Sequence, residues 1–379
     1  MKRILLVADP IGGSTSVQFQ FLLALAHDLR PLYRVAIFAP YCADRRARDL
    51  RAAGVALLTP GGTGFFGERV LSRLGSSNES MLWAESWVRE ALFDSNQIEI
   101  SEILSHERFD YVVNLSMTTP VPCDVWWIQG APLHLTIHGM ASTNIVARLT
   151  DMFGSRMVEV TDRRIIEVIQ RLSKSIVANS PFLADFYRSR GVPVRGVIYS
   201  LPDFSAFHPC EGVASRDYAL IYIGKETDSI NLEPLWEAGV RVVGFGGKIP
   251  AYTRIDRFRR WIDFRGHVSQ ADLVRLYSNA MFTLFPFTWE PLGCVPLESM
   301  ACGTPVLTYS RQGPASTVVA GRTGWLVNNS DEMVAKAVEI WKSGETGLSI
   351  DDCVRQARMF ALNRPASSLI DQFEGVPRQ

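Results

Sequence analysis

The sequence has few cysteines, and none of them are paired at close spacing. The six cysteines of the 379 residues stand at positions 42, 123, 210, 294, 302 and 353, so no Cys-x-x-Cys motif occurs. Six scattered cysteines are not typical of a disulfide framework or of a cysteine-based zinc site. The absence of close pairs favours a reducing compartment, so we expect a cytoplasmic protein without a structural metal.

Net charge and long apolar runs are also missing. The 39 basic residues balance 39 acidic ones, so no global field favours a nucleic-acid partner. The first apolar run stops at Asp9, too early for a secretory signal. No run reaches the roughly 18 residues of a membrane span. We expect a soluble chain, and peripheral contact with the inner face of a membrane stays open.

Two motifs of nucleotide-binding enzymes are incomplete. Gly12 and Gly13 follow the first apolar run, but the third glycine of a G-x-G-x-x-G fingerprint is missing. Taken alone, this pair is more typical of a tight turn. No Asp-x-Asp pair occurs, and Glu226 and Asp228 are the nearest approach to one. A diphosphate held by a metal ion is therefore not expected.

What the sequence does contain is a repeated alternation of apolar runs and amphipathic stretches. Such runs predict buried parallel strands separated by helices. In the first half the predicted strands are residues 4–8, 34–39, 111–115, 124–129 and 133–139. After a proline-rich linker at 197–209, the predicted strands are 218–224, 240–246, 262–266, 280–285, 304–308 and 324–327. We expect α/β domains at 1–200 and 201–361, with a last helix near 362–379 packing back on the first.

The most informative stretch is residues 287–307, FTWEPLGCVPLESMACGTPVL. Seven residues separate Glu290 from Glu298, which places Glu290 on an entry loop and Glu298 on the following helix. Pro296 is compatible with that helix only in its first turn. A bare pair of glutamates at this spacing is more often two surface residues, but the flanking sequence here is specific.

The backbone amides of Leu292, Gly293 and Cys294 lie at the predicted start of this helix, the positive end of its dipole. That position suits a phosphate group. Carboxylates on either side would accept hydrogen bonds from hydroxyl groups. A nucleotide diphosphate sugar has this order of parts: sugar hydroxyls, diphosphate and ribose hydroxyls.

Residues 287–307, with 175–209 and 266–327, resemble retaining glycosyltransferases of family 4 (glycosyl transferases group 1). That family has the GT-B fold, in which two Rossmann-like domains face each other and the donor site lies in the cleft between them. The resemblance implies that Glu290 contacts the donor sugar and Glu298 the ribose. It also implies that the loop of Gly12 and Gly13 faces the donor phosphate and the acceptor.

The resemblance extends to a histidine and to the basic residues of the donor site. His138, rather than His134, matches the histidine at a strand end that faces the donor sugar in the family. The family commonly has an arginine after the glycine of the first strand in the second domain, followed by a lysine. Here Lys225 follows Gly224 and no second base stands at the usual place, so Lys248 is our candidate for it.

The resemblance implies a hexosyltransferase-type enzyme that retains configuration and needs neither metal nor cofactor besides the donor. The acceptor would be a glycan, a lipid-linked molecule or a small molecule. Two alternatives stay open: a nucleotide-sugar epimerase and an inactive relative that only binds sugar nucleotides. Residues 252–262 contain four arginines and three aromatics, which fits either a membrane contact or a helix whose apolar residues face the core.

Overall fold

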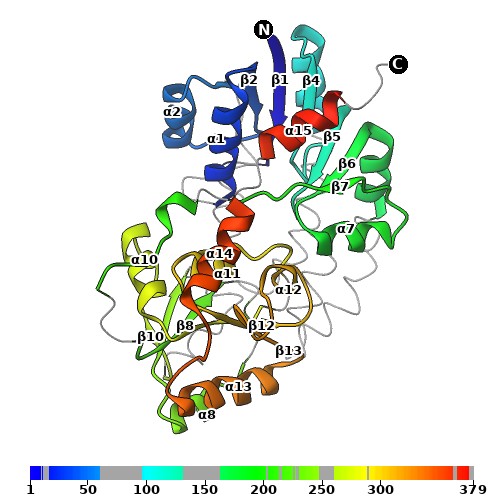
Figure 1. The fold of residues 1–379 in the computed structure, drawn as a ribbon. Coiled ribbons are helices and arrows are strands. Elements are labelled where there is room, and N and C mark those ends of the chain that lie inside the picture. The colour runs from blue at the N-terminus through cyan, green and yellow to red at the C-terminus, as the bar shows by residue number, and fades with distance from the viewer. Residues whose placement is uncertain are drawn as a thin grey trace.

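The computed structural model describes every residue except 10, 12–16, 60–95, 131–162, 202–203, 213–215, 225–226, 228–229, 247–259, 288–289, 362–364 and 375–379. The described chain forms two sheets, one above the other in Figure 1. Helices pack alongside both sheets. Neighbouring strands within each sheet run parallel. The predicted α/β class with two Rossmann-like sheets is confirmed.

The first sheet has seven strands in the order β3-β2-β1-β4-β5-β6-β7. They are β1 (Lys2–Val7), β2 (Tyr33–Phe38), β3 (Ala56–Leu58), β4 (Tyr111–Asn114), β5 (Cys123–Ile128), β6 (Ser173–Ala178) and β7 (Gly196–Val197). The last four residues of β1 are fully buried. A continuous apolar run is required here because both faces of the sheet are covered.

The second sheet has six strands in the order β10-β9-β8-β11-β12-β13. They are β8 (Ala219–Ile223), β9 (Val242–Gly246), β10 (Asp263–Phe264), β11 (Phe282–Phe285), β12 (Val306–Tyr309) and β13 (Gly324–Val327). The order reverses beside β8, where β9 lies on one side and β11 on the other. Ligands of open α/β sheets bind beyond the carboxyl ends of the strands at such a reversal.

Helices connect most of the strands. They are α1 (Val17–Leu29), α2 (Asp44–Ala52), α7 (Pro181–Arg188), α8 (Glu233–Glu237), α10 (Gln270–Asn279), α11 (Cys294–Ala301), α12 (Pro314–Thr317), α13 (Ser330–Ser343), α14 (Ile350–Ala361) and α15 (Pro365–Glu374). Residues 96–106 and 163–172 are also helical, and η1 (Phe204–Ala206) is a 3-10 turn.

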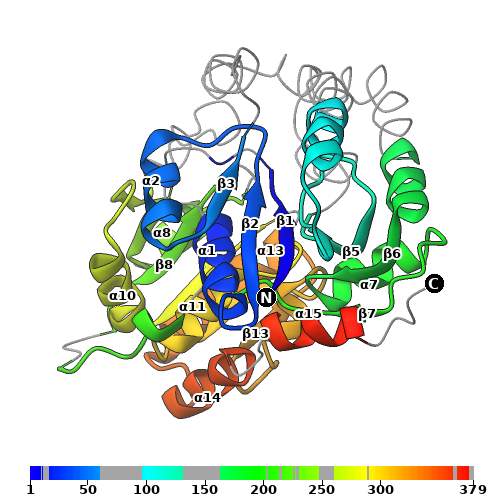
Figure 2. The same ribbon diagram turned by 90° about the horizontal axis from the view of Figure 1, so that it is seen from above.

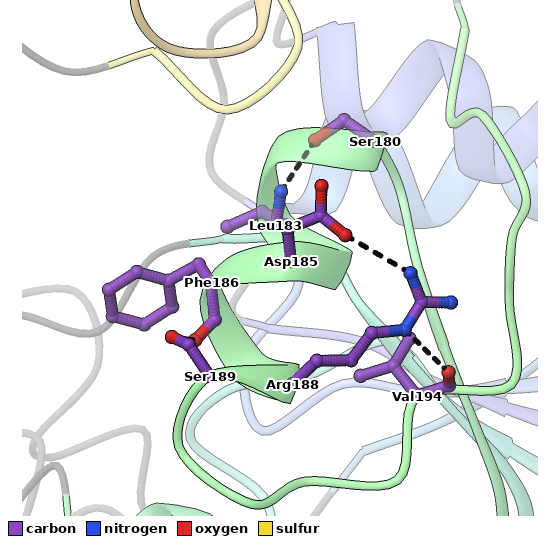
Figure 3. A network of polar contacts seen from close by, with 7 residues as sticks. All are labelled: Ser180, Leu183, Asp185, Phe186, Arg188, Ser189 and Val194. Carbon is purple, nitrogen blue, oxygen red and sulfur yellow. Dashed lines mark hydrogen bonds and ion pairs between the residues drawn. The ribbon is translucent and has the colours of Figure 1, made fainter.

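Helix α7 shows how the chain turns from a strand into a helix (Figure 3). The hydroxyl of Ser180 accepts a hydrogen bond from the backbone amide of Leu183 at 3.2 Å, which caps the helix. Near the other end, Arg188 donates to the carbonyl oxygen of Val194 at 3.0 Å and pairs with Asp185 at 3.1 Å. These contacts fix the connection that leads from β6 through α7 towards β7.

Strand β7 differs from the sequence prediction. It lies at the start of the segment that we predicted as an extended linker, and it pairs with β6. The strand predicted at 124–129 is confirmed as β5, which pairs with both β4 and β6. The predicted strand at 133–139, with His138, lies outside the described residues.

The end of the chain contacts both sheets. Cys353 and Ala357 of α14 pack in one cluster with Leu297 and Met300 of α11. Helix α15 lies against the first sheet in both views of the molecule (Figures 1 and 2), and Phe373 stacks on Tyr111 of β4 with ring centroids 4.6 Å apart. Its residues Ala366, Leu369 and Phe373 belong to the core around β1.

Of the basic and aromatic segment 252–262, the structure describes the last three residues. Ile262 is buried in the core of the second sheet, and Trp261 packs against the same core. Arg260 lies over the Trp261 ring at 4.6 Å. These apolar side chains therefore face the protein. None of the helices in the described ranges is long and apolar enough to cross a membrane.

Replacing Leu369 by alanine tests how strongly α15 supports the first sheet. Leu369 has no exposed surface, so Leu369→Ala should reduce the local free energy of unfolding by about 2–5 kcal/mol. Native-state hydrogen exchange of the β1 and β4 amides would measure the loss. The matched control is Met359→Ala on α14, where the side chain is 63% exposed and little change is expected. A loss below about 1 kcal/mol would contradict the structural role of α15.

Candidate functional site

The loop between β11 and α11 brings the first predicted carboxylate onto the start of the helix. Oε1 of Glu290 accepts hydrogen bonds from the backbone amides of Leu292, at 3.1 Å, and Gly293, at 3.0 Å. The carbonyl oxygen of Glu290 accepts a third bond from the amide of Gly313, at 2.9 Å. The glutamate thus closes the loop from both its side chain and its backbone.

Gly293 is required by the geometry of this turn. Its φ of +91° lies in the left-handed region, which residues with a Cβ rarely adopt. A Cβ at this position would also lie 2.9 Å from Cγ of Pro314. The glycine therefore allows the sharp turn by which the chain enters α11.

The sequence predicted separate contacts for these groups, with phosphate at the amides and sugar at Glu290. In the structure they contact each other. The carboxylate accepts hydrogen bonds from the two amides that directly precede Cys294, the first residue of α11, near the positive end of the helix dipole. The ligand contacts of Glu290, Leu292 and Gly293 stay predictions.

Glu298, the second predicted carboxylate, is buried. Only 6% of the residue is exposed, and its Oε2 accepts a hydrogen bond from the hydroxyl of Tyr277 at 3.0 Å. Burial raises the pKa of Glu298 to about 7, although the bond from Tyr277 lowers it in part. Near neutral pH the carboxyl group is therefore divided between its neutral and charged forms.

Cys294 is the first residue of α11 and lies close to both glutamates. Burial, and then the negative charges of Glu298 and Glu290, raise the pKa of its thiol well above the usual range. The thiol therefore stays protonated and is not a nucleophile. All six cysteines are free. Among the residues that the structure describes, no group of three or more His, Cys, Asp or Glu could hold a metal ion.

The other predicted site residues are Gly12, Gly13, His138, Lys225 and Lys248, and all lie outside the described residues. The strands before the two lysines are described.

Strands β8 and β9 end side by side, with Ile223 opposite Gly246. Gly246 has a φ of +134°, and a Cβ there would lie 2.1 Å from the carbonyl oxygen of Ile223. Only glycine allows this approach.

Sequence reasoning missed two polar arrangements. Tyr277 escaped notice because it lies on α10, at a position typical of a core residue. The second arrangement lies at the end of β1, where Oδ1 of Asp9 accepts hydrogen bonds from the hydroxyls of Ser116, at 2.5 Å, and Thr118, at 2.7 Å. The position of Asp9 directly after a buried strand was the only available signal.

The raised pKa of Glu298 predicts a pH-dependent stability. The folded state holds this proton more tightly than the unfolded state, whose carboxyl has the ordinary pKa of 4.5. The stabilisation is complete below pH 4.5 and is lost as the pH rises through about 7, a change of about 3 kcal/mol. Glu298→Gln keeps an acceptor for Tyr277 but cannot titrate. The difference in unfolding free energy between the two proteins should therefore change across this window, and parallel pH profiles would contradict the assignment.

Comparison with known proteins finds relatives of part of the chain and solved structures with a similar fold. Residues 259–359 match the model of the family described as glycosyl transferases group 1. A GDP-mannose-dependent α-(1-6)-phosphatidylinositol dimannoside mannosyltransferase of Mycobacterium tuberculosis is 32% identical over 144 residues, which span 37% of each chain. A D-inositol 3-phosphate glycosyltransferase of Streptosporangium roseum is 24% identical over 288 residues, 65% of each chain. The matched part is thus less than two thirds of either relative.

Solved structures resemble the chain over almost its whole length. The Anabaena protein HepE, solved with UDP and glucose, has a TM-score of 0.63 at 13% identity, covering 99% of this chain and 100% of that one. Sucrose-phosphate synthase of Thermosynechococcus elongatus has a TM-score of 0.65 at 14% identity, covering 99% of both chains. At sequence identities this low, the structural likeness shows only the fold, which is GT-B. Within that fold, residues 259–359 are similar to the glycosyl transferases group 1 family.

Proposed function

We propose that the protein transfers a sugar from a nucleotide diphosphate sugar to an acceptor hydroxyl, with retention of configuration. The observation that carries this proposal is the placement of Glu290 at the amides of Leu292 and Gly293, directly before α11, and of Glu298 on that helix. The arrangement lies within the segment that matches the family. Structures of HepE with UDP and with UDP-glucose, and the GDP-mannose dependence of the mycobacterial relative, support such a donor.

Each part of the donor has a proposed partner. Glu298 accepts a hydrogen bond from the ribose hydroxyls, and Glu290 and His138 contact the donor sugar. Lys225 and Lys248 follow the neighbouring strands β8 and β9, and their charges offset the diphosphate. The loop of Gly12 and Gly13 follows β1 in the first half and contributes backbone amides.

Glu290 has a second task in this proposal. Its carboxylate occupies the amides of Leu292 and Gly293, which would otherwise bind a phosphate oxygen. Two anions cannot share these amides without strong repulsion. We propose that the arriving diphosphate replaces the carboxylate there and that Glu290 turns to the sugar hydroxyls.

The reaction then needs neither metal nor cofactor. The bond between the anomeric carbon and the phosphate oxygen breaks, and the lysines and the dipole of α11 stabilise the leaving diphosphate. The acceptor hydroxyl attacks the oxocarbenium-like sugar from the same face. Its proton passes to the departing phosphate oxygen, so the new bond keeps the original configuration.

For the acceptor we propose only a chemical class, and for the location of the protein only a general compartment. The names of the relatives include an inositol phosphate and a phosphatidylinositol mannoside, so a polyol or a lipid-linked glycan is a suitable acceptor. A lipid-linked acceptor would place the protein at the inner face of a membrane. The packing of Trp261 and Ile262 into the core gives no support to a contact through those side chains. A cytoplasmic protein with a small-molecule acceptor remains the simpler form of the proposal.

A panel of nucleotide sugars, offered with and without an extract of acceptors, tests the proposed function. We expect a glycosylated product only when both donor and acceptor are present, and the anomeric configuration read by NMR should be retained. Conversion of the donor alone would favour an epimerase. Binding without any turnover would favour an inactive relative, and either result would overturn the proposal.

Alanine variants separate the roles of the two glutamates. Glu298→Ala should weaken binding of the donor and of the free nucleotide alike, by roughly 10- to 100-fold, because the ribose is present in both. Glu290→Ala should bind the nucleotide at least as well as the original protein, since a competitor for the amides is removed, but turnover should be lost. Calorimetric titration with UDP and GDP measures both effects. Unchanged nucleotide binding by Glu298→Ala would remove Glu298 from the site.

A further inference from the structure

Two side-chain amides meet at the carboxyl ends of β5 and β6. Gln129 directly follows β5 and Asn179 directly follows β6. The strands are in register up to the pair Ile128 and Ala178, and the backbone amide of Asn179 donates to the carbonyl oxygen of Ile128 at 3.0 Å. The two residues are therefore neighbours on the edge of the sheet where α/β proteins bind their ligands.

Asn179 is held in one orientation. Its Nδ2 donates to the carbonyl oxygen of Gln129 at 2.8 Å and to the hydroxyl of Ser200 at 3.4 Å. A flipped amide would place two carbonyl oxygens against each other, so Oδ1 is the atom that faces away from Gln129 O. Asn179 is 95% buried, since only 5% of it is exposed.

Each amide keeps one buried polar atom without a hydrogen bond. Across the described chain, neither Oδ1 of Asn179 nor Nε2 of Gln129 has a partner, so the two atoms do not bond to each other either. Proteins leave few buried polar atoms in this state, because the loss of hydration is not recovered. One acceptor and one donor are thus available at adjoining strand ends.

The surrounding backbone is firmly held. Trp127 of β5 donates from its ring nitrogen to the carbonyl oxygen of Ile198 at 2.8 Å, and the Ser180 hydroxyl caps α7. Tyr187 donates to the carbonyl oxygen of Gly130 at 3.5 Å. The ends of β5 and β6 that carry the two amides are therefore tied by hydrogen bonds to neighbouring elements, as suits a binding site.

Asn114, at the end of β4 on the same edge, provides the comparison. Its Nδ2 donates to the carbonyl oxygen of Thr119 at 2.8 Å, and its Oδ1 accepts from the amide of Ser116 at 2.8 Å. A purely structural asparagine in this position therefore uses both ends of its amide. Asn179 uses one.

We propose that Gln129 and Asn179 form a subsite for a sugar or polyol hydroxyl. A hydroxyl group donates one hydrogen bond and accepts others, so one such group fits an unpartnered acceptor beside an unpartnered donor. Both side chains are neutral, which favours a hydroxyl over a phosphate. The inference rests on the proposed function and adds two residues of the first half to its site. The hydroxyl belongs either to the donor sugar or to the acceptor.

The test is Gln129→Met, which keeps the size of the side chain and removes its amide. If the amide serves a ligand, the melting temperature of the free protein should stay equal or rise, because a buried atom without a partner is removed. The KM for one substrate should rise roughly 3- to 10-fold with little change in kcat. The control is Trp126→Phe. The ring nitrogen of Trp126 is also buried without a partner, but the residue belongs to a hydrophobic cluster with residues of β6 and α7. That variant should leave both KM values unchanged.

Comparing the donor, the free nucleotide and the acceptor shows which molecule carries the hydroxyl group that binds here. Weaker binding of UDP-glucose or GDP-mannose with unchanged binding of UDP or GDP assigns the subsite to the donor sugar. A raised KM for the acceptor alone assigns it to the acceptor. If Gln129→Met changes neither, or lowers the melting temperature without affecting KM, the subsite is overturned while turnover by the original protein still supports the proposed function.

The subsite can also be tested if the original protein turns over no sugar nucleotide. Saturation-transfer NMR with free glucose, mannose and myo-inositol then replaces the kinetic arms. Saturation that is present with the original protein and with Trp126→Phe, but lost with Gln129→Met, supports the subsite. Equal saturation with all three proteins, or none with the original protein, overturns it.

Discussion

The candidate site depends on the way α11 begins. Gly293, in the left-handed region, directly precedes the helix, and the Glu290 carboxylate accepts hydrogen bonds from the amides of Leu292 and Gly293. The Glu290 carbonyl oxygen also accepts the amide of Gly313, which joins this loop to the segment before α12. Leu297 and Met300 of α11 pack with Cys353 and Ala357 of α14, which holds the helix in place behind this loop.

Much of the fold follows from the sequence because its strands are buried on both faces. Continuous apolar runs identify such strands without help from tertiary contacts, and β1, β2, β8, β11 and β12 lie where those runs stand. Strands β3 and β7 have three and two residues and were not predicted. They exist because they pair with β2 and β6, and local sequence does not record that pairing.

The site was predictable to a lesser extent. The spacing of Glu290 and Glu298 placed one on a loop and one on a helix, as the structure has them. It gave no sign that Glu290 would bind the amides of Leu292 and Gly293, because a hydrogen bond from a side chain to nearby backbone depends on the turn. Nor did it reveal the bond from Tyr277 to Glu298, which joins α10 to α11 across 21 positions of sequence.

The charges around α11 explain why its amides matter. Cys294 stays neutral because burial raises the pKa of its thiol, and the negative charges of Glu298 and Glu290 raise it further. A diphosphate would add further negative charge to this region. Burial already keeps Glu298 partly protonated near neutral pH, which lowers the repulsion. In the proposed function, backbone dipoles and lysines supply the remaining compensation. Because Lys225 and Lys248 follow the strands β8 and β9, beside the reversal of strand order, they are suited to supply it. A buried glutamate and a donor with two phosphates can therefore bind in the same region if backbone amides and lysines offset their combined negative charge.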